Sequence, residues 1–206
     1  FAPGKDENSP CHPEGPYAES KWLAEKRLTE FCQKEGMDLT ILRLATLYGE
    51  GDPGNVARLM RMIDRGRFVW IGNGSNRKSL LHREDAARAC LAVAQKPFVG
   101  VRVFNVSAPP CAMRDVVEGL AAALGKRVPS LGVPASLAQG VSGFLSRLPV
   151  KRWQTLGATV QKWLADDAVD GSQFEKTYDF QPRINLAEGL RREVAWYRGE
   201  QAKRGT

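Results

Sequence analysis

Residues 15–25 read Gly15-Pro16-Tyr17-Ala18-Glu19-Ser20-Lys21-Trp22-Leu23-Ala24-Glu25. Proline is favoured at the first position of a helix, and most residues of this stretch are good helix formers. We therefore expect a helix over 16–35, closed by Gly36, because glycine readily adopts the left-handed conformation that ends helices. On such a helix Tyr17 and Lys21 are about one turn apart and share one face.

A lysine ammonium held beside a phenol favours the phenolate, which can then act as a general base. The Tyr17–Lys21 spacing therefore indicates proton-transfer chemistry. The same spacing also arises by chance in many chains, so the pair needs the support of its surroundings.

The surroundings supply that support. A strand of the buried kind, 38–44, follows the helix, and residues 42–51 then read Leu-Arg-Leu-Ala-Thr-Leu-Tyr-Gly-Glu-Gly. This order resembles the extended short-chain dehydrogenase/reductase family, the sugar-nucleotide epimerases and dehydratases. In that family a Tyr-x-x-x-Lys helix is followed by a strand ending Leu-Arg-Pro-x-Asn-Val-Tyr-Gly-Pro-Gly.

The resemblance continues in the same order along nearly the whole chain. It includes Gly54-Asn55-Val56, the segment 77–87 (Arg-Lys-Ser-Leu-Leu-His-Arg-Glu-Asp-Ala-Ala), 178–183 (Tyr-Asp-Phe-Gln-Pro-Arg) and 186–190 (Leu-Ala-Glu-Gly-Leu). The segment from about 132 to 170 is the least assignable. An ordered set of motifs is far more specific than any one of them.

One family motif is missing from the sequence. Family members begin with a Gly-x-x-Gly-x-x-Gly turn that lets the backbone approach the dinucleotide pyrophosphate. We therefore expect the carboxyl-terminal portion of a longer protein. The expected fold class is α/β: part of a Rossmann-like doubly wound sheet and a smaller α/β substrate-binding domain. Residues 1–50 would belong to the Rossmann part and 51–206 mostly to the substrate domain, with 82–108 returning to the sheet.

The resemblance implies an NAD(P)-dependent sugar-nucleotide 4-epimerase, inactive as this chain alone. In such enzymes nicotinamide takes a hydride from sugar carbon 4. Tyr17 would accept the hydroxyl proton, Lys21 would bind the nicotinamide ribose, and Leu44 and Ala45 would lie beside the cofactor. A 4-keto reductase or a dehydratase is the alternative within the family, and a noncatalytic sugar-nucleotide-binding fragment is the alternative outside it. Without the glycine turn, tight NAD or NADP binding by the chain itself is not expected.

A nucleotide-diphosphate sugar is the implied ligand, with a UDP-sugar as the first choice. The residues expected to contact it are Thr46, Asn55, Val56, Trp70, Arg77 and Lys78. Asn55 would cap a helix and meet the diphosphate there, since helix N-termini favour anions. Trp70 fits a place beside the base or in the core, and Arg77 or Lys78 matches the phosphate-binding arginine. His82 is expected to pack or cap a helix.

The chain has 206 residues, 43% hydrophobic and 26% charged, and a formal net charge of +7. Its cations are spread out, so nucleic acid is not an expected partner. The local cluster Arg58, Arg61, Arg65 and Arg67 suits a solvated face or a substrate diphosphate.

The four cysteines lack metal-binding spacing, so no metal is expected and reduced thiols suit a cytoplasmic protein. No apolar run could span a membrane, and no membrane partner is expected. The resemblance further implies a homodimer.

The remaining segments are expected to form scaffold. They are helices over 84–95, 112–124, 133–147 and 153–167, strands over 68–72 and 101–106, and a last helix begun by Asn185, with Glu188 as its capping-box partner.

Overall fold

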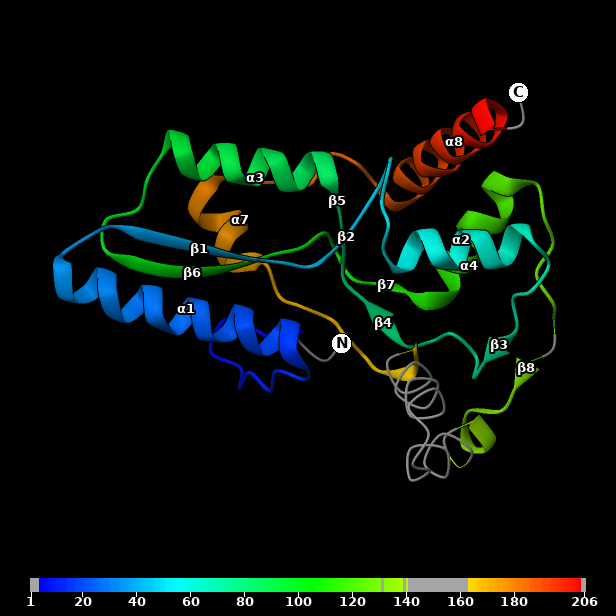
Figure 1. Ribbon diagram of the computed structural model, residues 1–206, viewed down its shortest axis with the longest axis horizontal. Helices are drawn as coiled ribbons and strands as arrows, with labels where there is room; N and C mark the ends of the chain where they lie inside the picture. The colour runs from blue at the N-terminus through cyan, green and yellow to red at the C-terminus, as the bar shows by residue number, and fades with distance from the viewer. Residues whose placement is uncertain (1–3, 131, 139, 141–162, 205–206) are drawn as a thin grey trace.

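The structure is a computed structural model that describes residues 4–130, 132–138, 140 and 163–204. The helices expected over 133–147 and 153–167 lie mostly outside these residues. Figure 1 shows helices and short strands arranged in two units, one around the strands β1 and β6 and the other around the helices α2, α4 and α8.

The first helix confirms its expected limits. α1 spans Pro16–Glu35 and ends at Gly36, whose φ of 65° is left-handed. β1 (Leu39–Leu44) follows and runs back along the helix. Arg43 of β1 joins the two elements, because its guanidinium donates to both carboxylate oxygens of Glu25 at 2.5 and 3.1 Å. It also lies 5.7 Å from the centre of the Trp22 ring.

β1 pairs in parallel with β6 (Val101–Val106), with Leu39 opposite Val101 and Leu44 opposite Val106. In Figure 1, α1 lies on one side of this strand pair and α3 (Arg83–Gln95) on the other. α7 (Ser172–Tyr178) packs against β6 on the side of α3. The parallel pairing, with helices on both sides, is the arrangement expected for a piece of a doubly wound sheet.

The side chains between these elements form the first core. Phe174 of α7 is completely buried, with its ring 5.8 Å from that of Phe104 and 5.2 Å from that of Phe180. Residues 172–180, which the sequence suggested for the substrate unit, therefore pack on the Rossmann strands. The buried members of this core are Ala45, Leu81, Ala86, Ala89, Phe104, Val106, Phe174 and Phe180.

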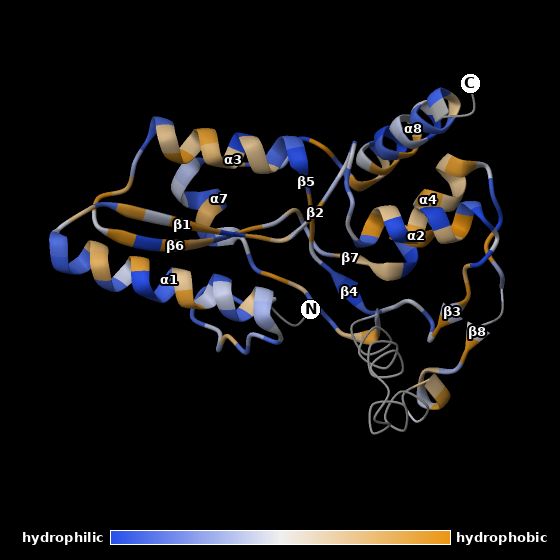
Figure 2. Cartoon of the chain, in the orientation of Figure 1, coloured by the Kyte–Doolittle hydropathy of each residue, from blue (hydrophilic) through white to orange (hydrophobic). Residues whose placement is uncertain are grey.

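The second unit is built on α2 (Asn55–Asp64), α4 (Met113–Leu124) and α8 (Leu186–Arg204). Apolar residues recur at helical spacing along α2 and α4, as Figure 2 shows, and their buried sides form the second core. Gly189 of α8 lies against Tyr48, and a β-carbon at that position would overlap the tyrosine hydroxyl. This close approach explains why a glycine belongs in the Leu-Ala-Glu-Gly-Leu stretch.

The remaining strands are short. β2 (Thr46–Tyr48) pairs in parallel with β5 (Leu80–His82), and β3 (Trp70–Ile71) with β8 (Gly132–Val133). β4 (Arg77–Lys78) pairs antiparallel with β7 (Cys111–Ala112). The strand expected over 68–72 is thus limited to Trp70 and Ile71. Residue 133, expected to be helical, belongs to a strand.

Two helix starts differ from their expected form. Gly54, not Asn55, is the residue that precedes α2, and no side chain caps this helix. Asn185 does cap α8, since its Oδ1 accepts from the Glu188 amide at 2.9 Å. In a full capping box the Glu188 carboxylate would accept from the Asn185 backbone amide. Here it accepts from the Arg191 guanidinium instead. An arginine one turn away competes for the carboxylate with the helix end.

Candidate active site

The carboxyl ends of β1 and β6 lie together because the two strands are parallel, and the Ala45 amide donates to the Val106 carbonyl at 2.9 Å just beyond them. α1 runs in the opposite direction, so the end at which it begins lies beyond this same edge (Figure 1). Ligands of open α/β sheets bind outside the carboxyl ends of the strands. This edge is therefore the first place to look for a site.

Tyr17 and Lys21 come together at the beginning of α1. The Lys21 ammonium nitrogen is 5.6 Å from the centre of the Tyr17 ring, and 77% of Tyr17 is exposed. The Ser20 hydroxyl donates to the Tyr17 carbonyl at 2.8 Å, within the helix. The phenol can thus reach a ligand while the cation stays beside it, which is the geometry that the sequence predicted.

A depression of about 360 Å³ opens beside the same edge. Ser107 and the prolines that follow β6 form one wall, and Asp170 and Gly171 form another. The chain near residue 170 is fixed by Lys5, whose amide donates to the Ala168 carbonyl and whose carbonyl accepts from the Asp170 amide, both at 2.9 Å. The depression therefore has walls held by backbone hydrogen bonds.

Arg77 and Lys78 have different surroundings. Arg77 lines the depression. The Lys78 ammonium donates to a carboxylate oxygen of Asp167 at 2.7 Å and to the Ala165 carbonyl at 2.8 Å. Neighbouring residues of a strand point to opposite sides. Of the two cations, Arg77 is the one placed beside a hollow that could take an anion.

The other predicted contacts divide into surface and core residues. Leu44 and Thr46 are exposed around the sheet edge, Ala45 is buried between them, and Asn55 is exposed at the start of α2. Val56 and Trp70 are buried in the second core. The Trp70 ring packs edge-on against Phe68 at 5.0 Å, and the Arg114 guanidinium lies 4.9 Å from its centre.

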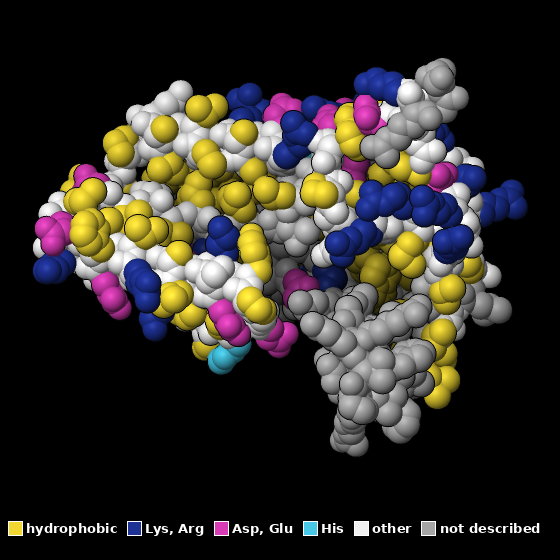
Figure 3. Space-filling view, viewed as in Figure 1, with side chains coloured by type: hydrophobic (Ala, Val, Ile, Leu, Met, Phe, Trp, Pro, Cys, Tyr) yellow, Lys and Arg dark blue, Asp and Glu magenta, His cyan; other side chains and the backbone are white. Residues whose placement is uncertain are grey.

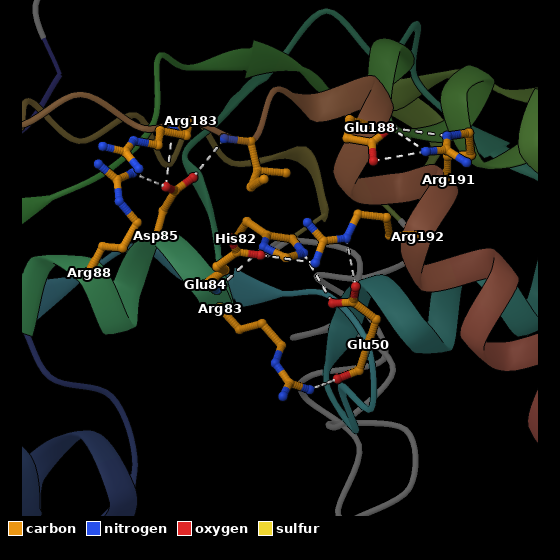
Figure 4. A network of polar contacts seen from close by, with 11 residues as sticks. Glu50, His82, Arg83, Glu84, Asp85, Arg88, Arg183, Glu188, Arg191 and Arg192 are labelled. Carbon is orange, nitrogen blue, oxygen red and sulfur yellow. Dashed lines mark hydrogen bonds and ion pairs between the residues drawn. The ribbon is translucent and has the colours of Figure 1, made fainter.

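A polar network between the units, in which His82 and Asp85 are buried, was not predicted (Figure 4). His82 caps α3, because its Nδ1 accepts from the Glu84 amide at 3.3 Å, and its Nε2 lies 3.3 Å from a Glu50 oxygen. The expectation that His82 packs or caps is confirmed. Arg192 of α8 connects Glu50 at 2.7 Å with Glu84 at 2.9 Å. Burial would raise the pKa of Glu50, but hydrogen bonds from its own backbone and from Arg192 lower it overall.

Asp85 is the central acceptor of this region and is fully buried. Its carboxylate accepts from the amides of Arg183 and Ile184 at 3.0 and 2.9 Å and from the Arg88 guanidinium at 2.6 Å. These bonds fix the segment that leads into α8. The sequence carried one signal for this role, an acidic residue in the first turn of α3, directly after a short apolar strand. An unpaired carboxylate would be costly to bury there, so a buried one needs hydrogen-bond donors.

Glu193 of α8 is also buried, with 1% of its surface exposed, and neither carboxylate oxygen has a hydrogen-bond partner among the described residues. Burial, with a smaller contribution from the Asp52 carboxylate, raises the pKa of Glu193 to about 8. The side chain is therefore largely protonated at neutral pH. It lies where α8 packs on the loop that leads to α2.

Two other kinds of site are absent from the part of the chain that the structure describes. No group of three or more histidine, cysteine, aspartate or glutamate side chains there could hold a metal ion. No helix within the same residues is long and apolar enough to cross a membrane.

Comparisons with known proteins show what the chain is similar to. Among curated proteins, N-acetyl-alpha-D-glucosaminyl-diphospho-ditrans,octacis-undecaprenol 4-epimerase of Escherichia coli O157:H7 is 29% identical over 198 residues, covering 93% of this chain and 59% of that protein. The chain thus spans about three fifths of this relative's length.

Two solved structures share the fold. UDP-glucose 4-epimerase of Thermotoga maritima, solved with UDP-glucose, gives a TM-score of 0.71 at 22% identity over 98% of this chain and 59% of that one. UDP-glucose 4-epimerase of Thermus thermophilus, solved with NAD, gives a TM-score of 0.68 at 22% identity. The match covers 96% of this chain and 58% of that one. The expected α/β, Rossmann-like fold class is confirmed.

The family model described as the NAD dependent epimerase/dehydratase family matches residues 2–107, which include α1, β1, α2, α3 and β6. This match covers the Tyr17–Lys21 pair and the strands that position it. The chain belongs to the NAD-dependent epimerase/dehydratase family.

Proposed function

We propose that the protein containing this chain is an NAD(P)-dependent 4-epimerase of sugars carried on a diphosphate. The observation that carries the proposal is the exposed phenol of Tyr17, with the Lys21 ammonium 5.6 Å from its ring centre, at the carboxyl edge of a parallel strand pair. Membership of the family supports the same conclusion.

Tyr17 is the general base of this proposal. Its hydroxyl oxygen takes the proton of the sugar 4-hydroxyl as carbon 4 is oxidised, and it returns the proton when carbon 4 is reduced. Lys21 supplies positive charge beside this phenol, with its ammonium nitrogen 5.6 Å from the ring centre. The exposure of Tyr17 is consistent with this role, since the phenol must reach a substrate hydroxyl.

The residues around Tyr17 suit the nicotinamide-ribose end of NAD or NADP. Lys21 would bind the ribose, and Leu44 and Ala45 would line the cofactor at the end of β1. When bound, this cofactor supplies the hydride chemistry at carbon 4. The glycine turn for the pyrophosphate is not part of this sequence, so the isolated chain should bind NAD weakly.

A diphosphate is the substrate group that Arg77 suits best. Arginine pairs with phosphate oxygens through two parallel hydrogen bonds, and Arg77 lines the depression beside the sheet edge. Asn55 and Thr46 are exposed and could add polar contacts. Substrate contacts by Lys78, Val56 and Trp70 stay predictions, and so do a homodimer and a cytoplasmic location.

What the diphosphate carries on its other side is a separate question. A UDP-sugar is supported by the fold shared with an epimerase solved with UDP-glucose. A polyprenyl-diphosphate sugar is supported by the name of the curated relative from Escherichia coli. The proposal covers both, because Tyr17 and Arg77 would treat the sugar and the diphosphate alike.

A direct test is to incubate the protein that contains this chain with NAD and either UDP-glucose or an N-acetylglucosaminyl-diphospho-polyprenol, and to follow the sugar by proton NMR. An epimerase gives the 4-epimer without net consumption of cofactor. A reductase instead consumes reduced nicotinamide in proportion to product, and a dehydratase gives a 4-keto-6-deoxy sugar. No change in either sugar would contradict the proposal and leave the noncatalytic alternative.

A further inference from the structure

α2 carries an arginine-rich solvent face whose charges the described structure leaves unused. Arg58, Arg61, Met62 and Arg65 fall within an arc of about 100° around the helix, opposite its buried residues. Arg67 continues the positive surface beyond the helix. Arg58, Arg65 and Arg67 are exposed, and Figure 3 shows Lys and Arg side chains gathered over this part of the molecule. We call these four arginines the α2 arginine face.

The charge of this face is not neutralised by nearby acids. Within the described part of the chain, no carboxylate forms an ion pair with any of the four arginines, although α8 takes part in several ion pairs. Asp64, the acid on α2 itself, accepts instead from the Tyr197 hydroxyl at 3.0 Å and lies 4.0 Å from the Lys126 ammonium. The face therefore presents a positive potential to solvent.

Apolar side chains accompany the arginines. Met62 is 46% exposed and Val69 is 53% exposed. A surface that combines arginines with exposed apolar side chains matches the boundary between lipid headgroups and acyl chains.

We propose that the α2 arginine face binds the surface of an anionic lipid bilayer. Anionic headgroups would pair with the arginines, and Met62 and Val69 would enter the interface. Nucleic acid suits the face less well, because residues 58–69 expose no aromatic side chain on which a base could stack: Phe68 is 4% exposed.

This contact differs from a membrane span, so it agrees with the lack of a spanning helix among the described residues. It departs from the expectation, drawn from the sequence, that the protein has no membrane partner, and that expectation stays a prediction. It also goes beyond the proposed function, since a bilayer contact would bring the site close to lipid-linked substrates but does not require turnover. The two can therefore fail separately.

The test is sedimentation of the chain with vesicles of phosphatidylcholine alone and of phosphatidylcholine mixed with phosphatidylglycerol, at low and raised salt. Binding should need the anionic lipid and weaken with salt. Arg58→Gln/Arg65→Gln should lower the partition coefficient about 30-fold, since each arginine near an anionic surface contributes about 1 kcal/mol. The matched control Arg27→Gln/Arg102→Gln removes the same amount of charge, but from α1 and β6. It should change the partition coefficient much less.

Circular dichroism of each variant checks that the fold is kept. We expect it to be kept, because the substituted side chains are exposed. Equal binding to both kinds of vesicle, or equal loss in the two double variants, would overturn the proposal. A parallel titration with single-stranded RNA completes the test. If Arg58→Gln/Arg65→Gln abolished RNA binding and left vesicle binding unchanged, the face would belong to nucleic acid and the proposal would be wrong.

Discussion

Lys21 holds its ammonium nitrogen 5.6 Å from the centre of the Tyr17 ring, one turn further along α1. A second pair on the same helix has nearly the same form, because the Lys26 ammonium lies 5.9 Å from the Trp22 ring. Only the first pair includes an ionisable ring. α1 therefore contains both the proposed catalytic pair and an internal control for it.

Lys21→Met should lower turnover about 100-fold in the enzyme that contains this chain, since general-base catalysis typically contributes at least that factor. The reason is that the change removes the positive charge that Lys21 holds beside the phenol. Lys26→Met, measured in the same NMR assay, should retain activity close to that of the unmodified enzyme. Equal losses in the two variants would show that Lys21 acts only through helix stability.

Arg77→Gln and Lys78→Gln should separate ligand binding from stability. Arg77→Gln should weaken UDP binding about 10-fold or more, because a charge-assisted hydrogen bond to phosphate is lost. Lys78→Gln should lower the melting temperature, because the Lys78 ammonium holds residues 165–167. Calorimetry with UDP and thermal unfolding measure the two effects. If instead Lys78→Gln weakened UDP binding and Arg77→Gln lowered the melting temperature, the two residues would have exchanged roles.

Asp85→Ala should lower the free energy of unfolding by about 3 kcal/mol or more, because two buried amides and Arg88 lose their acceptor. Asp115→Ala is a matched control, since Asp115 also accepts from a backbone amide, that of Ala112 at 3.1 Å, but at an exposed site. This control should cost about 1 kcal/mol. Urea unfolding of both variants checks the difference, and similar losses would contradict the structural role of Asp85.

Glu193 makes stability depend on pH. Its pKa is about 8 in the folded chain against an ordinary value of 4.5, so between these values the folded chain keeps a proton that the unfolded chain has lost. Stability should therefore fall as pH rises through this window, by up to about 1.4 kcal/mol per unit, and the contribution is gone above it.

Glu193→Gln should remove this fall, because the amide stays neutral at every pH. Urea unfolding of the unmodified chain and the variant across the window measures the effect. Glu118→Gln, which changes a 54% exposed carboxylate on α4, should leave the pH dependence as it was. A parallel pH dependence in Glu193→Gln and the unmodified chain would contradict the assignment.

The sequence predicted the elements whose signals are local. Pro16 and Gly36 bound α1 through backbone preferences that need no distant partner. The apolar spacing of α2 and the position of Asn185 before α8 are of the same kind. The Tyr17–Lys21 pair was also local, because helical geometry alone brings residues four apart together.

Features that depend on distant residues were missed. Asp85 gains its role from the amides of residues 183 and 184, nearly a hundred positions away. Trp70 was left between a ligand contact and the core, and its burial against Phe68 and Arg114 depends on tertiary packing.

Asn55 was expected to cap α2, but Gly54 occupies that position. Propensity indicates where a helix begins only to within a residue or two.

The most direct test of the central claim is the turnover of Tyr17→Phe in the enzyme that contains this chain. The change removes one oxygen from a 77% exposed side chain, so the fold and the binding of UDP-glucose should be kept. We predict that formation of the 4-epimer falls below detection while calorimetry gives an unchanged affinity. Epimer formation at a rate close to that of the unmodified enzyme would remove Tyr17 from the chemistry and contradict the account.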